Sequence, residues 1–195
     1  MSDYLRRLPI GQRVSTAPVT GNDLWPFDVD LETVALEEPR IPEPPRGGAG
    51  GLDCSSCRRT PGFDVWQDAS WALGIPEQPA GLPILAVLIS RAHHDLEDLP
   101  PDLAAELGPM IQRVARAVGS VDGVGRVHVN RWGDGGEHFH IWFLARPRGM
   151  WQLRGALLAV WDDLLPKVPQ EEWDRNRRIV AESMTAGGGT QLLSG

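Results

Sequence analysis

The spacing of hydrophobic residues changes within residues 82–145, and this change limits the fold more than any other feature. Residues 82–90 (LPILAVLIS) form a continuous apolar run, which is typical of a strand buried on both faces of a sheet. From residue 96 to 118 the apolar residues recur every three or four positions, as in an amphipathic helix. Pro100 and Pro101 suit the start of that helix. We therefore expect a central strand followed by a helix that packs on the sheet.

Two further strands follow the predicted helix. Residues 125–132 and 137–145 alternate apolar and polar side chains, and a short glycine-rich connection separates them. This arrangement predicts neighbouring antiparallel strands. Shorter strand patterns at 63–68 and 70–75 come before the central strand. The order of strands and helices predicts an α+β fold with a mostly antiparallel sheet.

The ends of the chain differ from this middle part. Residues 37–51 concentrate proline and glycine, which disfavour helix interiors and central strands. The last part contains two helical patterns, within 151–168 and 170–184, and then a glycine-rich tail that we expect to be frayed. We therefore predict an extended N-terminal arm over 1–51, a folded domain over 52–149 and a C-terminal helical extension over 150–195.

Composition limits the partners. A formal net charge of -7 argues against bulk attraction to nucleic acid or to anionic membranes, although local basic sites are compatible with it. The longest apolar run is too short to span a bilayer, and the N-terminal residues have no pattern of an export signal. We therefore expect a cytoplasmic protein. Cys54 and Cys57, the two cysteines, stand in a Cys-x-x-Cys pair, which in a reducing compartment indicates a metal or redox role.

Two histidines stand one residue apart in the last predicted strand. Because side chains alternate along a strand, His138, His140 and Trp142 share one face, while Phe139 and Phe143 share the other. The phenylalanine face is the core face. The histidines therefore meet a ligand or another layer, or they are ordinary surface or interface histidines.

The surrounding residues resemble the histidine triad (HIT) superfamily. The stretch HVNRWGDGGEHFHIWFLARPRG (128–149) resembles its motif of alternating histidines after an asparagine and a glycine-rich turn. The stretch LPILAVLISRAHHDLEDLPPDL (82–103) is similar to its strand that ends in a histidine before a helix. Trp142 occupies the third histidine position. The chain is similar to the galactose-1-phosphate uridylyltransferase branch in two features: the third position is not a histidine, and a Cys-x-x-Cys lies upstream.

The resemblance implies that His140 attacks phosphorus and forms a covalent nucleotidyl-histidine. A neutral imidazole can do so when a partner holds its other N–H, which a strand backbone can supply. Gly135 and Gly136 allow the backbone close to a phosphate, Asn130 could bond phosphate or ribose, and Trp142 can only donate. For Asn130 the alternative is a turn residue. The implied substrates are nucleotides such as nucleotide sugars or dinucleoside polyphosphates.

The tryptophan at the third position leaves two interpretations open. A lost third histidine removes a proton donor worth on the order of 10²–10⁴ in rate, unless the leaving group needs no proton. A nucleotidyl transferase or hydrolase that expels a phosphate is therefore the favoured interpretation. The alternative is a catalytically degenerate, zinc-stabilised nucleotide-binding or scaffold protein. Dimers are common in this superfamily, so the resemblance also raises a homodimer, although no residue here indicates one.

The cysteine pair offers two of the four ligands that a tetrahedral zinc requires. The uridylyltransferase resemblance supplies the other two, His93 after the central strand and His138 as the first histidine of the motif. Cys54, Cys57, His93 and His138 would form a closed, structural site. His94 is the alternative to His93, and a free thiol pair is the alternative to a metal site.

Overall fold

The chain is described by a computed structural model that covers residues 9, 11–13, 27, 32–58 and 62–193. By its internal contacts it divides into two units, residues 1–45 and 46–195. In the first unit the Gly11 amide donates to the Leu36 carbonyl, and the Leu36 amide donates to the Gln12 carbonyl. The described part of this unit is therefore partly held by backbone pairing.

The second unit begins with residues that pair with the histidine motif. Gly47 and Gly136 form an isolated parallel bridge. The Gly47 amide donates to the Gly135 carbonyl at 3.1 Å, and the Glu137 amide donates to the Gly47 carbonyl at 2.9 Å. Residues 46–51 belong to the predicted N-terminal arm but to the second unit of the structure. The predicted end of the arm at residue 51 therefore stays a prediction.

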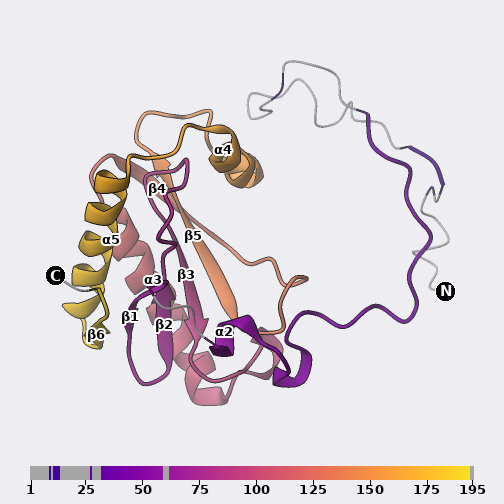
Figure 1. Ribbon diagram of the computed structural model, residues 1–195, viewed down its shortest axis with the longest axis horizontal. Coiled ribbons are helices and arrows are strands. Elements are labelled where there is room, and N and C mark those ends of the chain that lie inside the picture. Colours follow the sequence, from indigo (N-terminus) through magenta and orange to yellow (C-terminus); the bar gives the residue numbers. More distant parts are fainter. Residues whose placement is uncertain (1–8, 10, 14–26, 28–31, 59–61, 194–195) are drawn as a thin grey trace. The chain divides into compact units, whose positions relative to one another are not determined.

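A six-stranded sheet forms the centre of the second unit (Figure 1). Its strand order is β4-β5-β3-β2-β1-β6, and every neighbouring pair is antiparallel. This confirms the predicted α+β fold and the pairing of the two alternating strands. The strands are β1 (Asp64–Gln67), β2 (Trp71–Gly74), β3 (Leu85–Ser90), β4 (Val124–Asn130), β5 (His140–Pro147) and β6 (Thr190–Gln191).

Helices cover both faces of this sheet. On one face α3 (Pro101–Gly119) and α5 (Gln170–Thr185) enclose the main core, which contains Phe139 and Phe143. On the other face α4 (Leu158–Leu164) packs only at one end, around Leu82 and Leu144. The remaining helical elements are short: η1 (Ala49–Gly51), α2 (Ser55–Arg58), η2 (Leu96–Asp98) and η3 (Gly155–Leu157). Part of the second face is thus left for a site.

The predicted strands and helices are confirmed, with bounds that differ from the predicted ones by a few residues. The strand β3 is buried along its whole length, as its continuous apolar run predicts. The strand β5 begins at His140 rather than at 137, because the residues before it pair with residue 47 instead. The helix expected within 151–168 narrows to α4, since Gly155 has a positive φ of 70°.

The glycine-rich tail is not simply frayed, which corrects the prediction. Its residues Thr190 and Gln191 form β6, which pairs with β1 at the sheet edge. The Trp66 indole donates to the Gly188 carbonyl at 2.9 Å, and the Arg113 guanidinium donates to the same carbonyl. Long-range partners therefore order a segment whose own sequence favours disorder.

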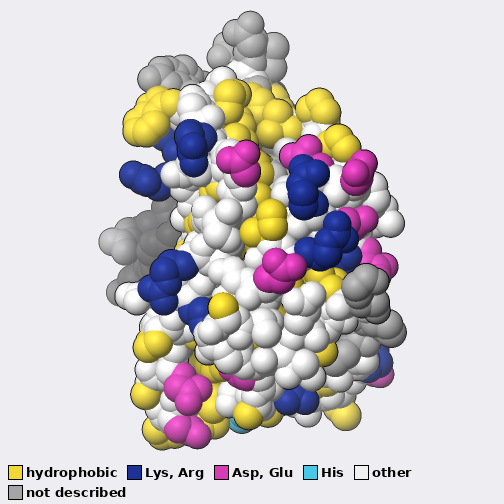
Figure 2. Space-filling view, turned by 90° about the vertical axis from the view of Figure 1, so that its left-hand side faces the viewer, with side chains coloured by type: hydrophobic (Ala, Val, Ile, Leu, Met, Phe, Trp, Pro, Cys, Tyr) yellow, Lys and Arg dark blue, Asp and Glu magenta, His cyan; other side chains and the backbone are white. Residues whose placement is uncertain are grey.

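The surface is mixed in charge on the side where α5 lies. Figure 2 shows basic and acidic side chains interspersed there, with apolar side chains gathered toward one end. This face has no broad basic area of the kind that binds nucleic acid backbones. Among the described residues, no helix has the length and apolar character needed to cross a bilayer.

Candidate functional site

The strand β5 places its side chains as the alternation predicts. Phe139, Ile141 and Phe143 are buried in the main core between the sheet and helices α3 and α5. His140 and Trp142 point to the opposite face and are partly exposed. The reactive candidate therefore stands on a rigid strand whose other face is fully anchored.

His140 has a backbone carbonyl at each ring nitrogen. Its Nδ1 lies 2.7 Å from the His138 carbonyl oxygen, and its Nε2 lies 2.7 Å from the Trp132 carbonyl oxygen. A neutral imidazole has one N–H, so it donates to one of these oxygens and presents a lone pair to the other. Donation from Nδ1 to His138 leaves Nε2 as the basic nitrogen, and the Trp132 carbonyl must then move for Nε2 to react.

A hollow of about 250 Å³ opens beside His140 on the same face. It is bounded by α2, by the start of β1, and by side chains of β3 and β5. Such a concave, mostly apolar surface with a few polar groups is typical of a small-molecule site. The lining residues are Ser55, Ser56, Phe63, Asp64, Val87, Ile89, His140 and Trp142.

Four residues that could hold a metal ion lie beside this hollow. The ligand atoms of Cys54, Cys57, His93 and His138 all lie within 4.8 Å of one another. Cys54 and His138 are buried, whereas Cys57 is exposed. These are the four residues of the predicted metal site; His94 is not among them, and its carbonyl accepts from the Phe139 amide.

The distances in this cluster fit zinc. With Zn–S bonds of about 2.3 Å and Zn–N bonds of about 2.05 Å, a tetrahedron separates sulfur and nitrogen ligands by about 3.5 Å. The His138 Nδ1 lies 3.4 Å from the Cys54 sulfur and 3.6 Å from the Cys57 sulfur. The His93 Nδ1 lies 3.4 Å from the Cys57 sulfur. The donor set and its spacing therefore suit a zinc ion in a closed site.

The outer contacts of His138 support the same assignment. Its Nε2 lies 2.8 Å from the Ser90 carbonyl oxygen at the end of β3. A metal-binding histidine usually donates its other N–H to such an acceptor, which fixes the tautomer and the ring. The His138 ring therefore has Nδ1 directed at the two cysteine sulfurs, and its backbone carbonyl oxygen lies 2.7 Å from the His140 Nδ1.

The other predicted substrate-binding residues lie outside the lining of the hollow. Asn130 ends β4 opposite Trp142 in the sheet register. Gly135 and Gly136 lie on the connection before β5, where both face Gly47. The structure thus brings His140 and Trp142 to the hollow, whereas Asn130, Gly135 and Gly136 are not among its lining residues.

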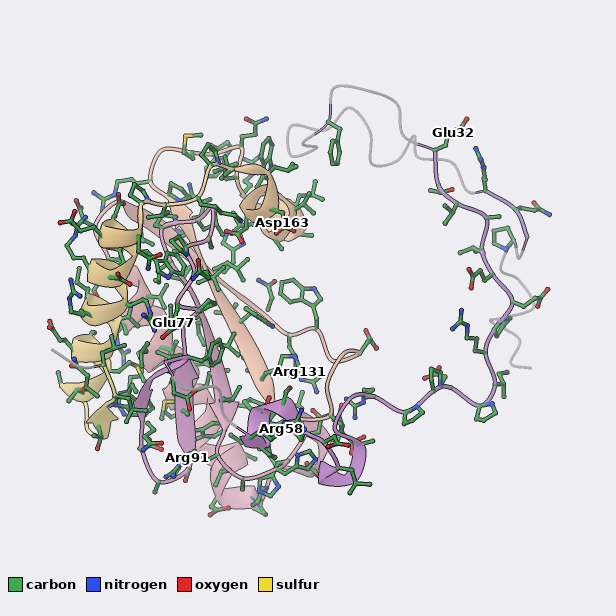
Figure 3. All side chains as sticks on the ribbon, in the orientation of Figure 1. Glu32, Arg58, Glu77, Arg91, Arg131 and Asp163 are labelled. Atoms are coloured by element: carbon green, nitrogen blue, oxygen red, sulfur yellow. The ribbon has the colours of Figure 1, made fainter. Side chains whose placement is uncertain are left out.

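A charged cluster that the sequence analysis missed holds the same connection. Asp95 is buried and accepts hydrogen bonds from Arg46 and Arg131. Arg131 lies on the connection between β4 and β5 (Figure 3), and Arg46 also donates to the Gly133 carbonyl at 2.9 Å. Burial favours protonation of Asp95, but the Leu96 amide and the two guanidinium groups outweigh it and lower the pKa of Asp95.

The sequence carried a partial signal for this cluster. Asp95 and Asp98 form a capping box around η2, a pattern that can be recognised from their spacing. The approach of two arginines from distant segments cannot be read from that spacing. The lining residues Ser55, Ser56, Phe63 and Asp64 were missed for the same reason, because the packing of α2 and the start of β1 against β3 and β5 is a long-range contact.

Comparisons with known proteins give a likeness in structure alone. No family model matches the chain, and no characterised protein matches it by sequence. A hypothetical histidine triad nucleotide-binding protein from Sulfolobus tokodaii strain7 is 17% identical, with a TM-score of 0.50 over 68% of this chain and 93% of that chain. A zinc-bound histidine triad family protein from Mycobacterium smegmatis is 18% identical, with a TM-score of 0.50 over 69% and 95%.

A uridylyltransferase mutant is 18% identical, with a TM-score of 0.48 over 72% of this chain and 50% of that chain. That likeness does not single out a branch of the superfamily. The matches to the two smaller proteins extend over nearly their whole length, while the identity is low. The chain therefore has the α+β fold of the histidine triad proteins.

Proposed function

We propose that this protein transfers a nucleotidyl group to water or to an acceptor through a covalent intermediate on His140. The observation that carries the proposal is the setting of the His140 ring, which lines the hollow while its Nδ1 lies 2.7 Å from the His138 carbonyl. That contact favours the tautomer whose Nε2 is the nucleophile. The fold supports the proposal because it is shared with a histidine triad nucleotide-binding protein.

The reaction has two displacements at phosphorus. In the first, the Nε2 lone pair of His140 attacks the α-phosphorus, an N–P bond forms, and the P–O bond to the leaving phosphate breaks with its electrons on oxygen. In the second, water or an acceptor hydroxyl attacks the same phosphorus and loses its proton to the surrounding solvent. The N–P bond then breaks and its electrons return to Nε2. The Trp132 carbonyl, 2.7 Å from Nε2, gives way before the first step.

The leaving group follows from Trp142, which stands where a third histidine would be. An indole N–H donates but cannot deliver a proton. A phosphate leaves as an anion without protonation, whereas an amine or an alkoxide does not. We therefore propose nucleoside diphosphate compounds, such as nucleotide sugars or dinucleoside polyphosphates, as substrates.

Binding of the phosphates is proposed for the margin of the hollow. Asn130 lies opposite Trp142 across the β4–β5 pair, and its amide can donate to a phosphate or ribose oxygen. Gly135 and Gly136 allow close approach of the backbone on the connection before β5. Donors placed there would stabilise the negative charge that develops on the phosphoryl oxygens.

We also propose that Cys54, Cys57, His93 and His138 hold a structural zinc ion. The sulfur–nitrogen distances of 3.4–3.6 Å support it, and four protein ligands leave no position open for a reacting water. A zinc ion there would link the separate segments that carry its ligands and would thereby stabilise the folded protein. Because His138 also accepts from His140, the ion would steady the reactive ring through the backbone.

Labelling with α-³²P nucleotides tests the proposal. Incubation with α-labelled nucleoside diphosphate compounds should give protein-bound, acid-labile and hydroxylamine-sensitive label, as expected for a phosphoramidate. His140→Ala should carry none, whereas the matched control His94→Ala, which keeps the backbone contact of residue 94, should be labelled like wild type. Absence of label in wild type with every nucleotide tried would refute the transfer mechanism.

A second candidate function is nucleotide binding without turnover. The Trp132 carbonyl at His140 Nε2, together with Trp142 in place of a histidine, favours it. In that case nucleotides should raise the melting temperature equally in wild type and His140→Ala, and no product should form. Label on His140 would exclude this candidate.

A further inference from the structure

The Trp132 carbonyl lies against the ring nitrogen on which the proposed transfer depends. Its oxygen is 2.7 Å from the His140 Nε2, while the His140 Nδ1 is 2.7 Å from the His138 carbonyl oxygen. If Nε2 carries the proton, it donates to Trp132 and has no lone pair for attack. If Nδ1 carries the proton, the Nε2 lone pair faces an oxygen that cannot donate to it. In the reactive tautomer, contacts elsewhere must therefore keep the Trp132 carbonyl in place.

The residues on both sides of Trp132 are anchored to one carboxylate. Arg131 lies on the connection before β5 (Figure 3), and its guanidinium donates to Asp95. On the other side of Trp132, the Gly133 carbonyl accepts from Arg46 at 2.9 Å, and Arg46 also donates to Asp95. A large movement of the Trp132 carbonyl therefore requires that at least one of these two anchors opens.

Asp95 is the fixed member of this charged cluster. It is 5% exposed, and its carboxylate also accepts from the Leu96 amide at 2.7 Å, at the start of η2. The side chains of Arg46 and Arg131 are more accessible, with 33% and 21% of their surface exposed. Opening of an anchor is therefore a movement of an arginine away from a carboxylate that stays where it is.

The connection is packed closely around the Arg131 guanidinium. A Cβ on Gly133 would lie 3.1 Å from the Arg131 Cζ and closer still to its Nη1. The guanidinium thus takes the space that a side chain at residue 133 would need. The φ of Gly133 is outside the left-handed region, so alanine can adopt its backbone conformation. A methyl group at residue 133 should therefore displace the guanidinium from Asp95 without removing a charge.

The end of the connection nearer β5 is held separately. The Gly47 amide donates to the Gly135 carbonyl at 3.1 Å, and the Glu137 amide donates to the Gly47 carbonyl at 2.9 Å. These backbone hydrogen bonds do not involve the carboxylate of Asp95. Opening of the charged cluster should therefore free the stretch around Trp132 while residues 135–137 stay in place.

From these contacts we propose that the charged cluster controls access to the reactive nitrogen of His140. Its positioning residues are Arg46, Asp95 and Arg131. While the cluster is closed, the Trp132 carbonyl covers Nε2; when it opens, Nε2 is uncovered and can react. The inference rests on the proposed role of His140 as the nucleophile. Weakening the cluster should therefore speed the reaction of His140, whereas loss of a group that only stabilises the fold would not.

Acylation of the full chain by diethyl pyrocarbonate tests this access without any nucleotide. The reagent transfers an ethoxycarbonyl group to an imidazole nitrogen that has a free lone pair, and fragment-ion mass spectrometry separates His140 from His138. In Arg131→Gln the rate at His140, relative to that at His128 on β4, should rise about tenfold, because losing a charge-assisted hydrogen bond shifts an equilibrium by about that factor. Equal relative rates in wild type and variant would overturn the proposal.

Two further variants separate access from stability. Gly133→Ala keeps every charge but displaces the guanidinium, so it should raise the rate at His140 as Arg131→Gln does. The double variant should be no faster than either single variant, because both act through the same contact. Arg126→Gln is the matched control: it removes a guanidinium of β4 that donates to its neighbour's carbonyl, and it should react like wild type. A wild-type rate in Gly133→Ala would contradict the role of the guanidinium.

Labelling with α-³²P nucleotides distinguishes this proposal from the proposed function. If both hold, label should enter His140 about tenfold faster in Arg131→Gln than in wild type at saturating nucleotide. Faster acylation without any label would keep the control of access and remove the transfer mechanism. Label in wild type, with acylation and labelling rates unchanged in the variants, would keep the transfer mechanism and remove the control of access. Should Arg131→Gln fail to fold, Arg46→Gln, in which a more exposed side chain is changed, decides in the same way.

Discussion

The metal cluster and the hollow lie on the same face of the sheet and share one short segment, yet they are built differently. The cluster consists of four side chains that converge, and its His138 ring is fixed on both sides, by sulfur and by the Ser90 carbonyl. The hollow is bounded by side chains that face an open space, with His140 as its one imidazole. The side chains of the metal cluster hold one another in place, whereas the hollow leaves room for a ligand.

The difference shows how two histidines one residue apart can have separate roles. His138 is 2% exposed and uses its ring for the cluster and its carbonyl for His140, so it links the two regions. The His140 Nδ1 lies against that carbonyl oxygen, and the His140 Nε2 lies against the Trp132 carbonyl oxygen. Changes in the cluster should therefore reach the hollow through the contact between the His138 carbonyl and His140, and through Ser55 and Ser56, which lie between the two cysteines.

Removing a ligand of the cluster should give the largest effect. In Cys54→Ser we expect the zinc content to fall from about one per chain to near zero, together with a loss of about 4 kcal/mol in the free energy of unfolding. That is the linkage expected when free metal exceeds its dissociation constant about a thousandfold. Elemental analysis and urea titration measure both quantities. His94→Ala should keep its zinc; full metal retention in Cys54→Ser would contradict the ligation.

Restoring a histidine at the third position should change the hollow and leave the cluster intact. In Trp142→His we expect cleavage of substrates with poor leaving groups, such as nucleoside 5′-phosphoramidates, to rise by about 10², because a general acid becomes available. Nucleoside diphosphate compounds should gain little. Initial rates with both substrate types check this, with Trp142→Phe as the control that adds no acid. A similar gain for both types would mean that the leaving group is not what Trp142 limits.

Substitution of Asp95 tests whether the charged cluster stabilises the connection before β5 independently of the metal cluster and the hollow. Asp95→Asn removes charge-assisted hydrogen bonds from Arg46 and Arg131, so we expect a loss of about 2 kcal/mol in stability at pH 7. Because the pKa of Asp95 is lowered in the folded state, its contribution is present above the ordinary pKa of about 3.9 and is lost as the pH falls through the lowered value.

The difference between wild type and Asp95→Asn should therefore be constant above about pH 5 and should shrink in more acidic solution. Urea titrations at several pH values measure it. A difference that grows toward acid pH would have the wrong sign for a carboxylate stabilised in its charged form.

The sequence allowed the cluster to be predicted better than the hollow, for a physical reason. Alternation in β5 and the Cys-x-x-Cys spacing are local patterns, and the resemblance supplied His93 and His138. The hollow depends on strand register, which carries Asp64 three strands away from Trp142. Register follows from long-range pairing and cannot be read from any one segment.

The tail and the charged cluster show the same limit. Residues 187–189 are all glycine, so their own sequence favours fraying, and pairing with β1 and contacts to Trp66 and Arg113 overrule it. Asp95 was visible as part of a helix start, whereas its arginine partners come from 49 and 36 residues away. Local sequence patterns therefore predicted the helices and strands, whereas the contacts of the tail and of Asp95 depend on residues distant in the sequence.

Gly74→Ala should give the smallest effect, and it should affect the hollow without affecting the metal cluster. The new methyl would lie 2.0 Å from the Phe63 ring, and the ring, being only partly buried, can swing away from its row. We expect a cost of about 1 kcal/mol in stability, at the low end for overpacking, and weaker binding of every nucleotide. Zinc content should stay at the wild-type value, because β2 contributes no ligand. Calorimetry and elemental analysis on one preparation test both statements. Loss of zinc in this variant would mean that the wall of the hollow supports the cluster, and the two regions would then be one structural unit.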